Sequence, residues 1–522
     1  MPPEHCLSPM PREHYINPLG VQAADPFAFR HKGMYYLYAT HDPDTSSGLR
    51  VWTSEDLVHW RLRGFALERA ATAWAQSRFW GGEVIHHNDA FYLFYTASPD
   101  RSGGPVLNMQ VGLAKADSPL GPFKEVASPF LKGTGADEAI DQNVVMGPDG
   151  RLYFNWTRVT LGQNEVQCAR LSEDLTRLDS TAVTLLEPHS PWERHPWEGH
   201  YVLEGSFLLR HKQWYYLLFT ANHFRDARHA MGYAVGTHPL GPFERAPENP
   251  ILQAAGRIVG VGNGSPVLSP DGNEWMFLYH AHARPGRVAP RQLALDRLRF
   301  TRQDGAPDRL EILGPTESPQ PLPSGARPRR TSIREDFVDE MDWGLWTIIN
   351  EAPGQWARKQ GRLVLQLLAA AADAEWDDLR NLFMVETPGP DRPFVARAEV
   401  NLADSRPGDC ARLFLHQNHQ RHAFVELACT AQGLEFRSAM REDDAHHEVL
   451  RLDATAPAGE LEITYSGRHA AFRARPHGGE WTDLGRIYVE LELPRAGITA
   501  HGASPQPGRT AQFTLFHVEA AH

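Results

Sequence analysis

The chain has 522 residues, of which 42% are hydrophobic and 22% charged, enough for two or three globular domains. Its net charge of −12 argues against a nucleic-acid partner, and no apolar run approaches the roughly 20 residues of a membrane-spanning helix. Abundant glycine (43), proline (40) and aromatic residues (14 Trp, 14 Tyr, 24 Phe) favour an all-β chain with many turns.

The first 20 residues contain no apolar stretch of the kind that a secretory signal needs. We therefore expect a cytoplasmic protein. The cysteines have no spacing typical of a metal or redox site, and we expect reduced thiols at Cys6, Cys168, Cys410 and Cys429.

An aromatic, strand-like segment recurs five times at intervals of about 60 residues. Most copies follow a turn-like pair or triplet such as Asp149-Gly150, which is typical of a hairpin. The copies are Tyr35–Thr40, Phe91–Thr96, Leu152–Thr157, Tyr215–Thr220 and Met276–Ala281.

Two other segments repeat at about twice that interval. Ser54–Leu57 returns as Ser172–Leu175, and Pro119–Phe123 returns as Pro239–Phe243. A unit of this size that holds several short strands indicates a blade of a β-propeller, here with five blades. The alternative is five unrelated strands of similar composition.

The first strand of each blade should line the propeller axis and precede the aromatic strand. A polar residue occupies that region in every repeat, namely Asp25, Glu83, Asp141, Glu204 and Asn263. Carboxyl groups that converge on one axis shift each other's pKa, and such sites are usually functional. The alternative is that each acid caps a turn or pairs with a nearby arginine.

Residues 15–320 resemble glycoside hydrolase family 43, whose members are five-bladed propellers that act on arabinose- and xylose-containing glycans. No single motif is specific to this family, but the occurrence of the motifs in this order, at the spacing of the blades, is fairly specific. The motifs are Asp25-Pro26-Phe27 with Gly33–Tyr38, Ile140–Asn143 with Asp149–Tyr153, Glu204–Phe207 with Tyr215–Leu217, and Gly260–Ser265 with Tyr279–His282.

This resemblance implies three acidic roles. Asp25 matches the general base that activates water, and Glu204 matches the general acid that protonates the leaving oxygen. Asp141 matches the third acid, which raises the pKa of the general acid and orients it. Because the family inverts configuration, the carboxyls of Asp25 and Glu204 are expected roughly 6.5–9.5 Å apart.

The resemblance and the blade positions also suggest residues that bind the substrate. Trp80 matches an aromatic residue that faces the sugar, and Arg291 matches an arginine that reaches the active site. The other expected substrate-binding residues are Glu83, Asn263, Phe29 and His41. The alternatives are core packing for Trp80, Phe29 and His41 and a surface position for Arg291.

No cofactor is expected to be required. Many relatives have a histidine at the position of Asn263, and it helps to organise a calcium ion or water cluster on the axis. With asparagine there, a structural Ca²⁺ becomes doubtful. His280 and His282 alternate on one strand and are weak candidates for metal ligands, although hydrogen-bonded structure is the commoner role of such a pair.

Residues 316–332 are rich in proline and predict a linker between a propeller at 1–315 and a second domain at 333–522. The second domain lacks the repeat but has alternating strand-like runs, which favour a β-sandwich. Its opening resembles the concanavalin-like sandwich of many family 43 enzymes. The runs are 362–368, 393–402, 410–417, 422–430, 434–440, 461–465 and 510–518.

Together these patterns predict an all-β enzyme, a five-bladed β-propeller followed by a β-sandwich. The expected activity is an inverting exo-glycosidase that releases terminal α-L-arabinofuranose or β-D-xylose from plant-type oligosaccharides. One alternative is a retaining fructoside hydrolase, although its Asn-Asp-Pro-Asn-Gly type of opening is missing around Asp25. Another is an inert carbohydrate-binding propeller. The oligomeric state is not predicted.

Overall fold

The computed structural model describes residues 13–521, except 43, 101–107, 134–136, 353, 371–378, 389–391, 419–420, 443–444 and 504–507. The chain divides into two compact units. The first comprises Asn17–Glu317 with Pro323–Ala326, and the second comprises the remaining described residues. Within the described part of the chain, no helix is long and apolar enough to cross a membrane.

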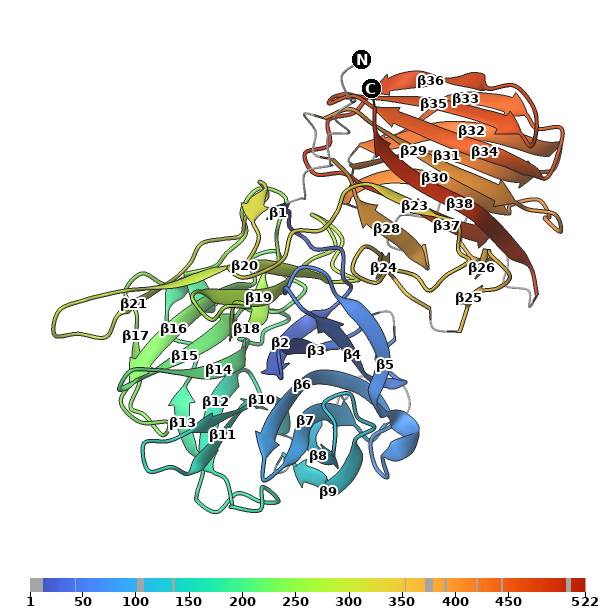
Figure 1. Ribbon diagram of the computed structural model, residues 1–522. Helices are drawn as coiled ribbons and strands as arrows, with labels where there is room; N and C mark the ends of the chain where they lie inside the picture. Colours follow the sequence, from blue (N-terminus) through green and yellow to red (C-terminus); the bar gives the residue numbers. More distant parts are fainter. Residues whose placement is uncertain are drawn as a thin grey trace. The chain divides into compact units, whose positions relative to one another are not determined.

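The first unit is a five-bladed propeller of four-stranded antiparallel sheets (Figure 1). Short 3₁₀ helices lie at η1 (Arg69–Ala71) and η2 (Pro191–Glu193). The blades are β2 (Ala24–His31), β3 (Met34–Thr40), β4 (Gly48–Ser54), β5 (Arg61–Glu68); β6 (Ser77–His87), β7 (Ala90–Ser98), β8 (Gln110–Ala116), β9 (Lys124–Leu131); β10 (Glu138–Met146), β11 (Leu152–Val159), β12 (Asn164–Arg170), β13 (Val183–Leu186); β14 (Leu203–His211), β15 (Trp214–Ala221), β16 (Ala230–Gly236), β17 (Glu244–Arg245); and β18 (Gly262–Leu268), β19 (Trp275–Ala281), β20 (Gln292–Thr301), β21 (Arg309–Ile312).

The recurring aromatic segment is the second strand of each blade. Its side chains fill the space between blades, where Tyr38, Tyr95, Tyr216 and Phe154 are completely buried. The first strands β2, β6, β10, β14 and β18 each contact the first strands of the neighbouring blades and surround the centre (Figure 1). The period found in the sequence is therefore the blade period.

The segment before β2 closes the ring against blade five. The backbone N–H of Leu19 donates to the Leu293 carbonyl, and the N–H of Leu293 donates to the Val21 carbonyl, both at β20. The buried side chain of Asn17 adds two hydrogen bonds to the backbone of Leu295, each 2.9 Å long. Residues distant in sequence thus hold the first and last blades together.

The second unit is a β-sandwich with two mainly antiparallel sheets. One sheet contains β25 (Trp356–Arg358), β26 (Leu363–Gln366), β38 (Thr510–Ala520), β29 (Phe394–Asn401), β34 (Ala458–Tyr465), β35 (His469–Pro476) and β36 (Thr482–Tyr488), with β23 (Ile333–Glu335) beside β38. The other contains β24 (Thr347–Ile349), β28 (Leu382–Glu386), β37 (Arg495–Gly502), β30 (Cys410–Asn418), β31 (Arg421–Thr430), β32 (Gly433–Glu442) and β33 (Ala445–Asp453), with β27 (Leu368–Ala369) parallel to β37. A small sheet joins β1 (His14–Tyr15) to β22 (Gln320–Pro321).

The two large sheets of the sandwich bury one apolar core between them. Alternate residues of the central strands enter it, including Leu413 and Leu415 of β30 and Leu461 and Ile463 of β34. This period of two is the pattern expected for strands that cover a core with one face.

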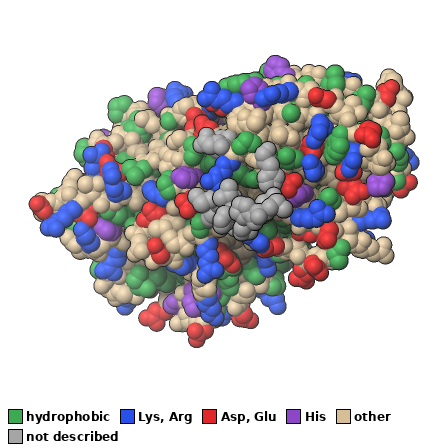
Figure 2. Space-filling view, turned by 45° about the horizontal axis from the view of Figure 1, so that its top comes forward, with side chains coloured by type: hydrophobic (Ala, Val, Ile, Leu, Met, Phe, Trp, Pro, Cys, Tyr) green, Lys and Arg blue, Asp and Glu red, His purple; other side chains and the backbone are tan. Residues whose placement is uncertain are grey.

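On the face in Figure 2, basic and acidic side chains are interspersed, so the negative net charge is not gathered there.

Candidate active site

Each first strand of the propeller contains a β-bulge at the same place. In blade one, Ala24 pairs with Thr40 but Phe27 pairs with Tyr38, so β2 carries one extra residue. The residue after the first of these pairs has a positive φ in all five blades. These residues are Asp25 (49°), Gly81 (41°), Asp141 (51°), Gly205 (58°) and Asn263 (40°).

The backbone conformation explains part of the residue pattern at the bulge. Glycine, asparagine and aspartate adopt positive φ more readily than other residues. At Gly205 a side chain would also collide with the amide of Asn263. Aspartate at positions 25 and 141 is therefore compatible with the backbone as well as with chemistry.

The bulge corrects the alignment of blades that the sequence suggested. By pairing register, Glu204 lies one position before the bulge residue and Glu83 lies two positions after it. The alignment of the fifth aromatic repeat with the first also changes by one residue. In pairing register, His280 is the residue of blade five that corresponds to Thr40, whereas the sequence repeat aligned Ala281 with it. A bulge adds a single residue to a strand, and a repeat spacing of about 60 residues is too coarse to reveal it.

Hydrogen bonds connect the second strand to the bulge of the next blade in four of the five blades. The hydroxyl of Thr40 accepts from the N–H of Gly81 (3.1 Å), and that of Thr96 accepts from the N–H of Asp141 (3.2 Å). Thr220 does the same for Asn263, at 3.0 Å. In blade five, Nδ1 of His280 takes this place, 3.2 Å from the backbone nitrogen of Asp25. After blade three, the N–H of Gly205 donates to Asp141 and not to Thr157.

Asp25 is surrounded by groups that favour its ionised form. Nη1 of Arg291 and Nδ2 of Asn263 each lie 3.1 Å from its Oδ1. The hydroxyl of Thr40 donates to Oδ2 at 2.7 Å, and Nδ1 of His280 lies 3.3 Å from Oδ1. Burial alone would raise the pKa of Asp25, but Arg291 and the hydrogen bonds from His280 and Thr40 outweigh it and hold the pKa below its usual range.

Asp141 and Glu204 are shifted in the opposite direction. Burial and the charge of Asp25 raise the pKa of Asp141 to about 7, although the Gly205 N–H donates to its Oδ2 at 3.0 Å. Burial, followed by the charges of Asp141 and Asp25, raises the pKa of Glu204 well above its usual value. One ionised carboxylate and one protonated carboxyl group can therefore coexist near neutral pH.

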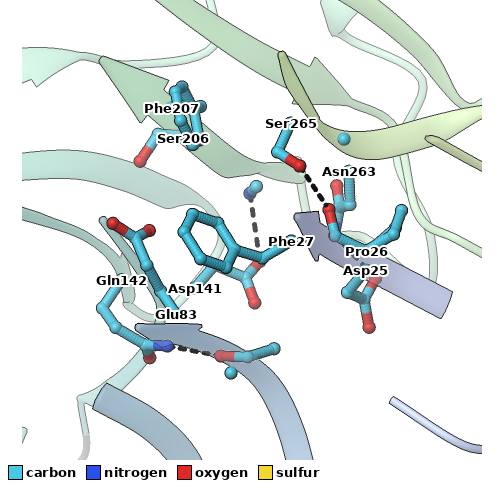
Figure 3. A pocket seen from close by; sticks show the side chains of 14 residues that line it. Asp25, Pro26, Phe27, Glu83, Asp141, Gln142, Ser206, Phe207, Asn263 and Ser265 are labelled. Carbon is cyan, nitrogen blue, oxygen red and sulfur yellow. Dashed lines mark hydrogen bonds between the residues drawn. The ribbon is translucent and has the colours of Figure 1, made fainter. Parts of the chain in front are cut away.

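A pocket opens at these bulges and extends along the five first strands (Figure 3). Asp25 and Asp141 line it, together with Phe27, Phe207 and the other residues that follow each bulge. Its empty volume is about 420 Å³.

Glu83 lines the pocket but is held by another network. Nδ2 of Asn143 lies 3.0 Å from both of its carboxylate oxygens, and the Val144 N–H donates to Oε1 at 3.0 Å. Asn143 in turn accepts from Asn155, whose Oδ1 accepts from the hydroxyl of Ser206. Burial raises the pKa of Glu83 to about 8.

Four expected substrate-binding residues lie outside the lining of this pocket, namely Trp80, Phe29, His41 and Arg291, and so does Glu204. Half-buried Trp80 directly precedes Gly81 and corresponds in register to Glu204. Phe29 packs on the ring of Phe91, 5.9 Å away, because it lies beyond the bulge at the contact between two blades. His41 is buried, with Nε2 3.3 Å from Nη1 of Arg50.

The two candidate metal ligands have separate partners. His280 contacts Asp25, whereas Nε2 of His282 donates to the Phe224 carbonyl at 2.7 Å. In the described part of the chain, no three His, Cys, Asp or Glu side chains are placed to hold a metal ion. Calcium takes about six to eight oxygen ligands. The Asn263 Oδ1, a buried oxygen without a hydrogen-bond partner among the described residues, does not provide such a shell.

Sequence reasoning missed Asp42, which holds Arg291 in place. Its carboxylate accepts from Nη2 of Arg291 at 2.9 Å and from Nε at 3.1 Å. The ring of Phe224 lies under the guanidinium group, 4.7 Å away. Asp42 follows the first aromatic segment by two residues, and only the position of Arg291 in space distinguishes it from the other acids.

Comparison with known proteins identifies the family. The model of glycosyl hydrolases family 43 matches residues 15–307, more than half of the chain. The chain belongs to glycoside hydrolase family 43. A xylosidase/arabinosidase of Bacteroides ovatus is 24% identical over 44% of this chain and 78% of its own length. A xylosidase/arabinosidase 43B of Humicola insolens is 24% identical over 72% of this chain and 63% of its own.

Solved structures of family 43 enzymes share the fold. A thermostable family-43 glycoside hydrolase is 33% identical and covers 60% of this chain and 100% of its own, with a TM-score of 0.53. BlXynB of Bacillus licheniformis is 20% identical and covers 97% of this chain and 100% of its own, with a TM-score of 0.60. These findings confirm the family 43 resemblance, the propeller and sandwich, and the expectation of a glycoside hydrolase.

Proposed function

We propose that this family 43 glycoside hydrolase removes a terminal pentose, α-L-arabinofuranose or β-D-xylose, from oligosaccharides with inversion of configuration. Asp25 is the general base that takes a proton from the attacking water. Glu204 is the general acid that protonates the leaving oxygen, and Asp141 raises the pKa of Glu204. The observation that carries this proposal is the opposite pKa shifts of Asp25, which lines the pocket, and of Glu204, which directly precedes the pocket-lining Gly205.

The chemistry needs these two charge states at the same pH. Arg291 and His280 hold Asp25 ionised, while burial and the neighbouring acids hold Glu204 protonated. Water attacks the anomeric carbon as its proton passes to Asp25, and the glycosidic bond breaks as Glu204 gives its proton to the leaving oxygen. The xylosidase and arabinosidase names of the relatives support a pentose as the sugar released.

The first experiment measures hydrolysis of the p-nitrophenyl α-L-arabinofuranoside and β-D-xylopyranoside. Asp25→Ala should lower kcat at least about a hundredfold on the substrate that the wild type accepts. Glu204→Ala should lower it less on this substrate than on an oligosaccharide, because p-nitrophenolate leaves without being protonated. Glu311→Gln, on the outer strand β21, is the control. Undiminished activity of Asp25→Ala or Glu204→Ala would disprove the assigned roles.

The products test the stereochemistry and the mode of cleavage. Proton NMR of the first product formed should show the anomer opposite to that of the substrate. Release of the same anomer would require a retaining mechanism. Digestion of an arabino- or xylo-oligosaccharide should give the monosaccharide from the first time point, and early release of larger fragments would instead indicate endo cleavage.

A further inference from the structure

Three aromatic rings of blade four form a continuous contact that ends at Arg291. The rings of Trp197 and His223 are stacked, with their centroids 4.7 Å apart and their planes 11° apart. His223 contacts Phe224, at 4.6 Å between centroids and 28° between planes. Phe224 lies 4.7 Å from the guanidinium carbon of Arg291, which bonds to Asp25. Trp197 is the outer end of this contact and is half-buried.

The segment that carries Trp197 is fixed from two sides. Trp197 and His200 exchange two backbone hydrogen bonds of 2.9 Å across a tight turn. Nε2 of His200 lies 2.7 Å from Oδ1 of Asn164 in blade three, and the N–H of Asn164 donates to the Tyr201 carbonyl. The Trp197 ring is therefore held in place before any ligand binds.

The His223 segment is fixed as well. The amide of the adjacent Asn222 donates to the carbonyls of Trp192 and Arg228, and its Oδ1 accepts from the His195 N–H. Burial and the charge of Arg225 lower the pKa of His223 to about 4, so its ring is neutral near neutral pH. Trp197 thus stacks on a rigid, uncharged ring.

The segments of Trp197 and His223 are close to Glu204 in the sequence and in strand pairing. Trp197 precedes Glu204 by seven residues, and His223 follows Thr220, the pairing partner of Glu204, by three. In the proposed mechanism Glu204 protonates the leaving oxygen, so the leaving sugar lies on its side of the pocket. Trp197 and His223 come from the loops at that same end of blade four.

We propose that Trp197, supported by His223, is the platform on which the ring of the leaving-group sugar stacks. This inference rests on the proposed function and adds a binding site for the part of the oligosaccharide that remains after cleavage. The C–H groups on one face of a pyranose form an apolar surface that matches an indole ring, as in other aromatic recognition of saccharides. A platform fixed in advance loses little conformational entropy on binding.

The test compares two substrates that carry the same pentose. One is the disaccharide or trisaccharide that the wild type cleaves, and the other is the corresponding pentosyl fluoride, whose leaving group is too small to reach the platform. Trp197→Ala should lower kcat/KM for the oligosaccharide about tenfold more than for the fluoride, the loss expected for one stacking contact of about 1.4 kcal/mol. Trp197→Leu should behave in the same way, since it retains apolar volume without a ring face.

Trp197→Phe provides the matched control because it restores a ring and should recover much of the oligosaccharide rate. Thermal melting checks that the variants fold. Equal losses on both substrates, or none, would overturn the platform while leaving the proposed function intact. A wild type that cleaves neither pentosyl fluoride nor oligosaccharide would instead refute the proposed function and, with it, this inference.

Discussion

Arg291 is the residue around which the charges of the pocket are arranged. Its guanidinium group bonds to Asp25 and Asp42 and is buried, with the ring of Phe224 below it. The same positive charge lowers the pKa of Asp25 strongly but acts only weakly against the burial of Glu204. Direct bonding to Arg291 therefore keeps Asp25 ionised, whereas for Glu204 burial and the two neighbouring acids outweigh the arginine.

Replacing Asp141 by asparagine should move the basic limb of the pH profile. The negative charge of Asp141 raises the pKa of Glu204, so its removal lowers that pKa and Glu204 loses its proton at lower pH. Asparagine can still accept the hydrogen bond from the Gly205 N–H. We expect the descending limb of kcat/KM against pH to shift to lower pH in Asp141→Asn, with the ascending limb nearly in place. An unmoved descending limb would contradict this coupling.

Replacing Arg291 by methionine should move the other limb. Asp25 then loses the positive charge that most strongly opposes the effect of burial on its pKa. The pKa of Asp25 therefore rises, and this carboxylate accepts a proton at higher pH. We expect the ascending limb of kcat/KM in Arg291→Met to shift to higher pH and the maximum rate to fall. Arg297→Met, which removes a partly buried pair with Glu274, is the control. If both variants keep the wild-type profile, Arg291 does not set the charge of Asp25.

The sequence predicts which acids matter better than it predicts where they lie. Asp25, Asp141, Arg291 and Asn263 are brought together as the motifs suggested. Because of the bulge, however, Glu83 occupies a different register position in its blade from that of Asp25 in blade one. It therefore has different hydrogen-bond partners. Asp42 could not be found in advance, because its importance depends entirely on a pairing across 249 positions of the chain.

At the scale of elements, a hydrogen-bonded network joins the first strands of blades two, three and four. Glu83 of β6 bonds to Asn143 of β10, and Ser206 of β14 bonds to Asn155 of β11, which bonds to Asn143. The Leu208 N–H also donates to Oδ1 of Asn143 at 2.8 Å. These polar bonds connect the first strands where they converge.

Glu83 makes this network sensitive to pH. Its pKa is about 8 in the folded protein against 4.5 for the free side chain, so the folded state holds this proton more tightly. The stability contributed by the protonated group is complete below about pH 4.5 and is lost as the pH rises towards 8. Glu83→Gln, which stays neutral, should therefore melt about 2 to 4 °C above the wild type at pH 8.

The same comparison at pH 5 provides the control, because Glu83 is then protonated and the two proteins should melt at nearly equal temperatures. Thermal unfolding followed by circular dichroism at both pH values measures the difference. A Glu83→Gln protein that is less stable than the wild type at both pH values would show that Glu83 is ionised in the folded state.

Strand prediction found several central strands of the sandwich but missed others, among them the buried strands β28 and β37 and the exposed strand β33. The expected run at 410–417 corresponds to β30, and the run at 422–430 corresponds to β31, and both strands are buried on both faces along most of their length. β33 escaped notice because nearly all of its residues are exposed, which leaves no hydrophobic period. Its pairing with β32, which supplies the hydrogen bonds, is invisible in the local sequence.

At the scale of the whole molecule, the period of about 60 residues and its loss after the prolines predicted the propeller and the sandwich. The two units have separate cores, and each also contains buried ion pairs. In the sandwich, Glu426 accepts from Nε of Arg412 at 2.9 Å and from Nη2 of Arg437 at 2.6 Å. Burial opposes its ionisation, but the two arginines lower the pKa of Glu426 to about 2.

Breaking this cluster should affect one unit only. Glu426→Gln removes the counter-charge of Arg412 and one of the two acids paired with Arg437, which costs about 3 kcal/mol and should lower the melting temperature of the sandwich by about 5 to 10 °C. Because the pKa of Glu426 is depressed, the loss should be full above about pH 4.5 and should shrink as the pH falls towards 2. Scanning calorimetry should show a displaced transition for the sandwich, while kcat/KM on the pentoside stays at the wild-type value.

Glu448→Gln is the matched control, since Glu448 pairs with Arg451 on the exposed strand β33 and a surface pair contributes about 1 kcal/mol or less. A shift confined to Glu426→Gln and to one transition would establish that the cluster stabilises the sandwich and that the propeller melts by itself. If the propeller transition and the catalytic rate fell together with that of the sandwich, the two units would form one cooperative system, and the stability of the active site would depend on a charge cluster in the other unit.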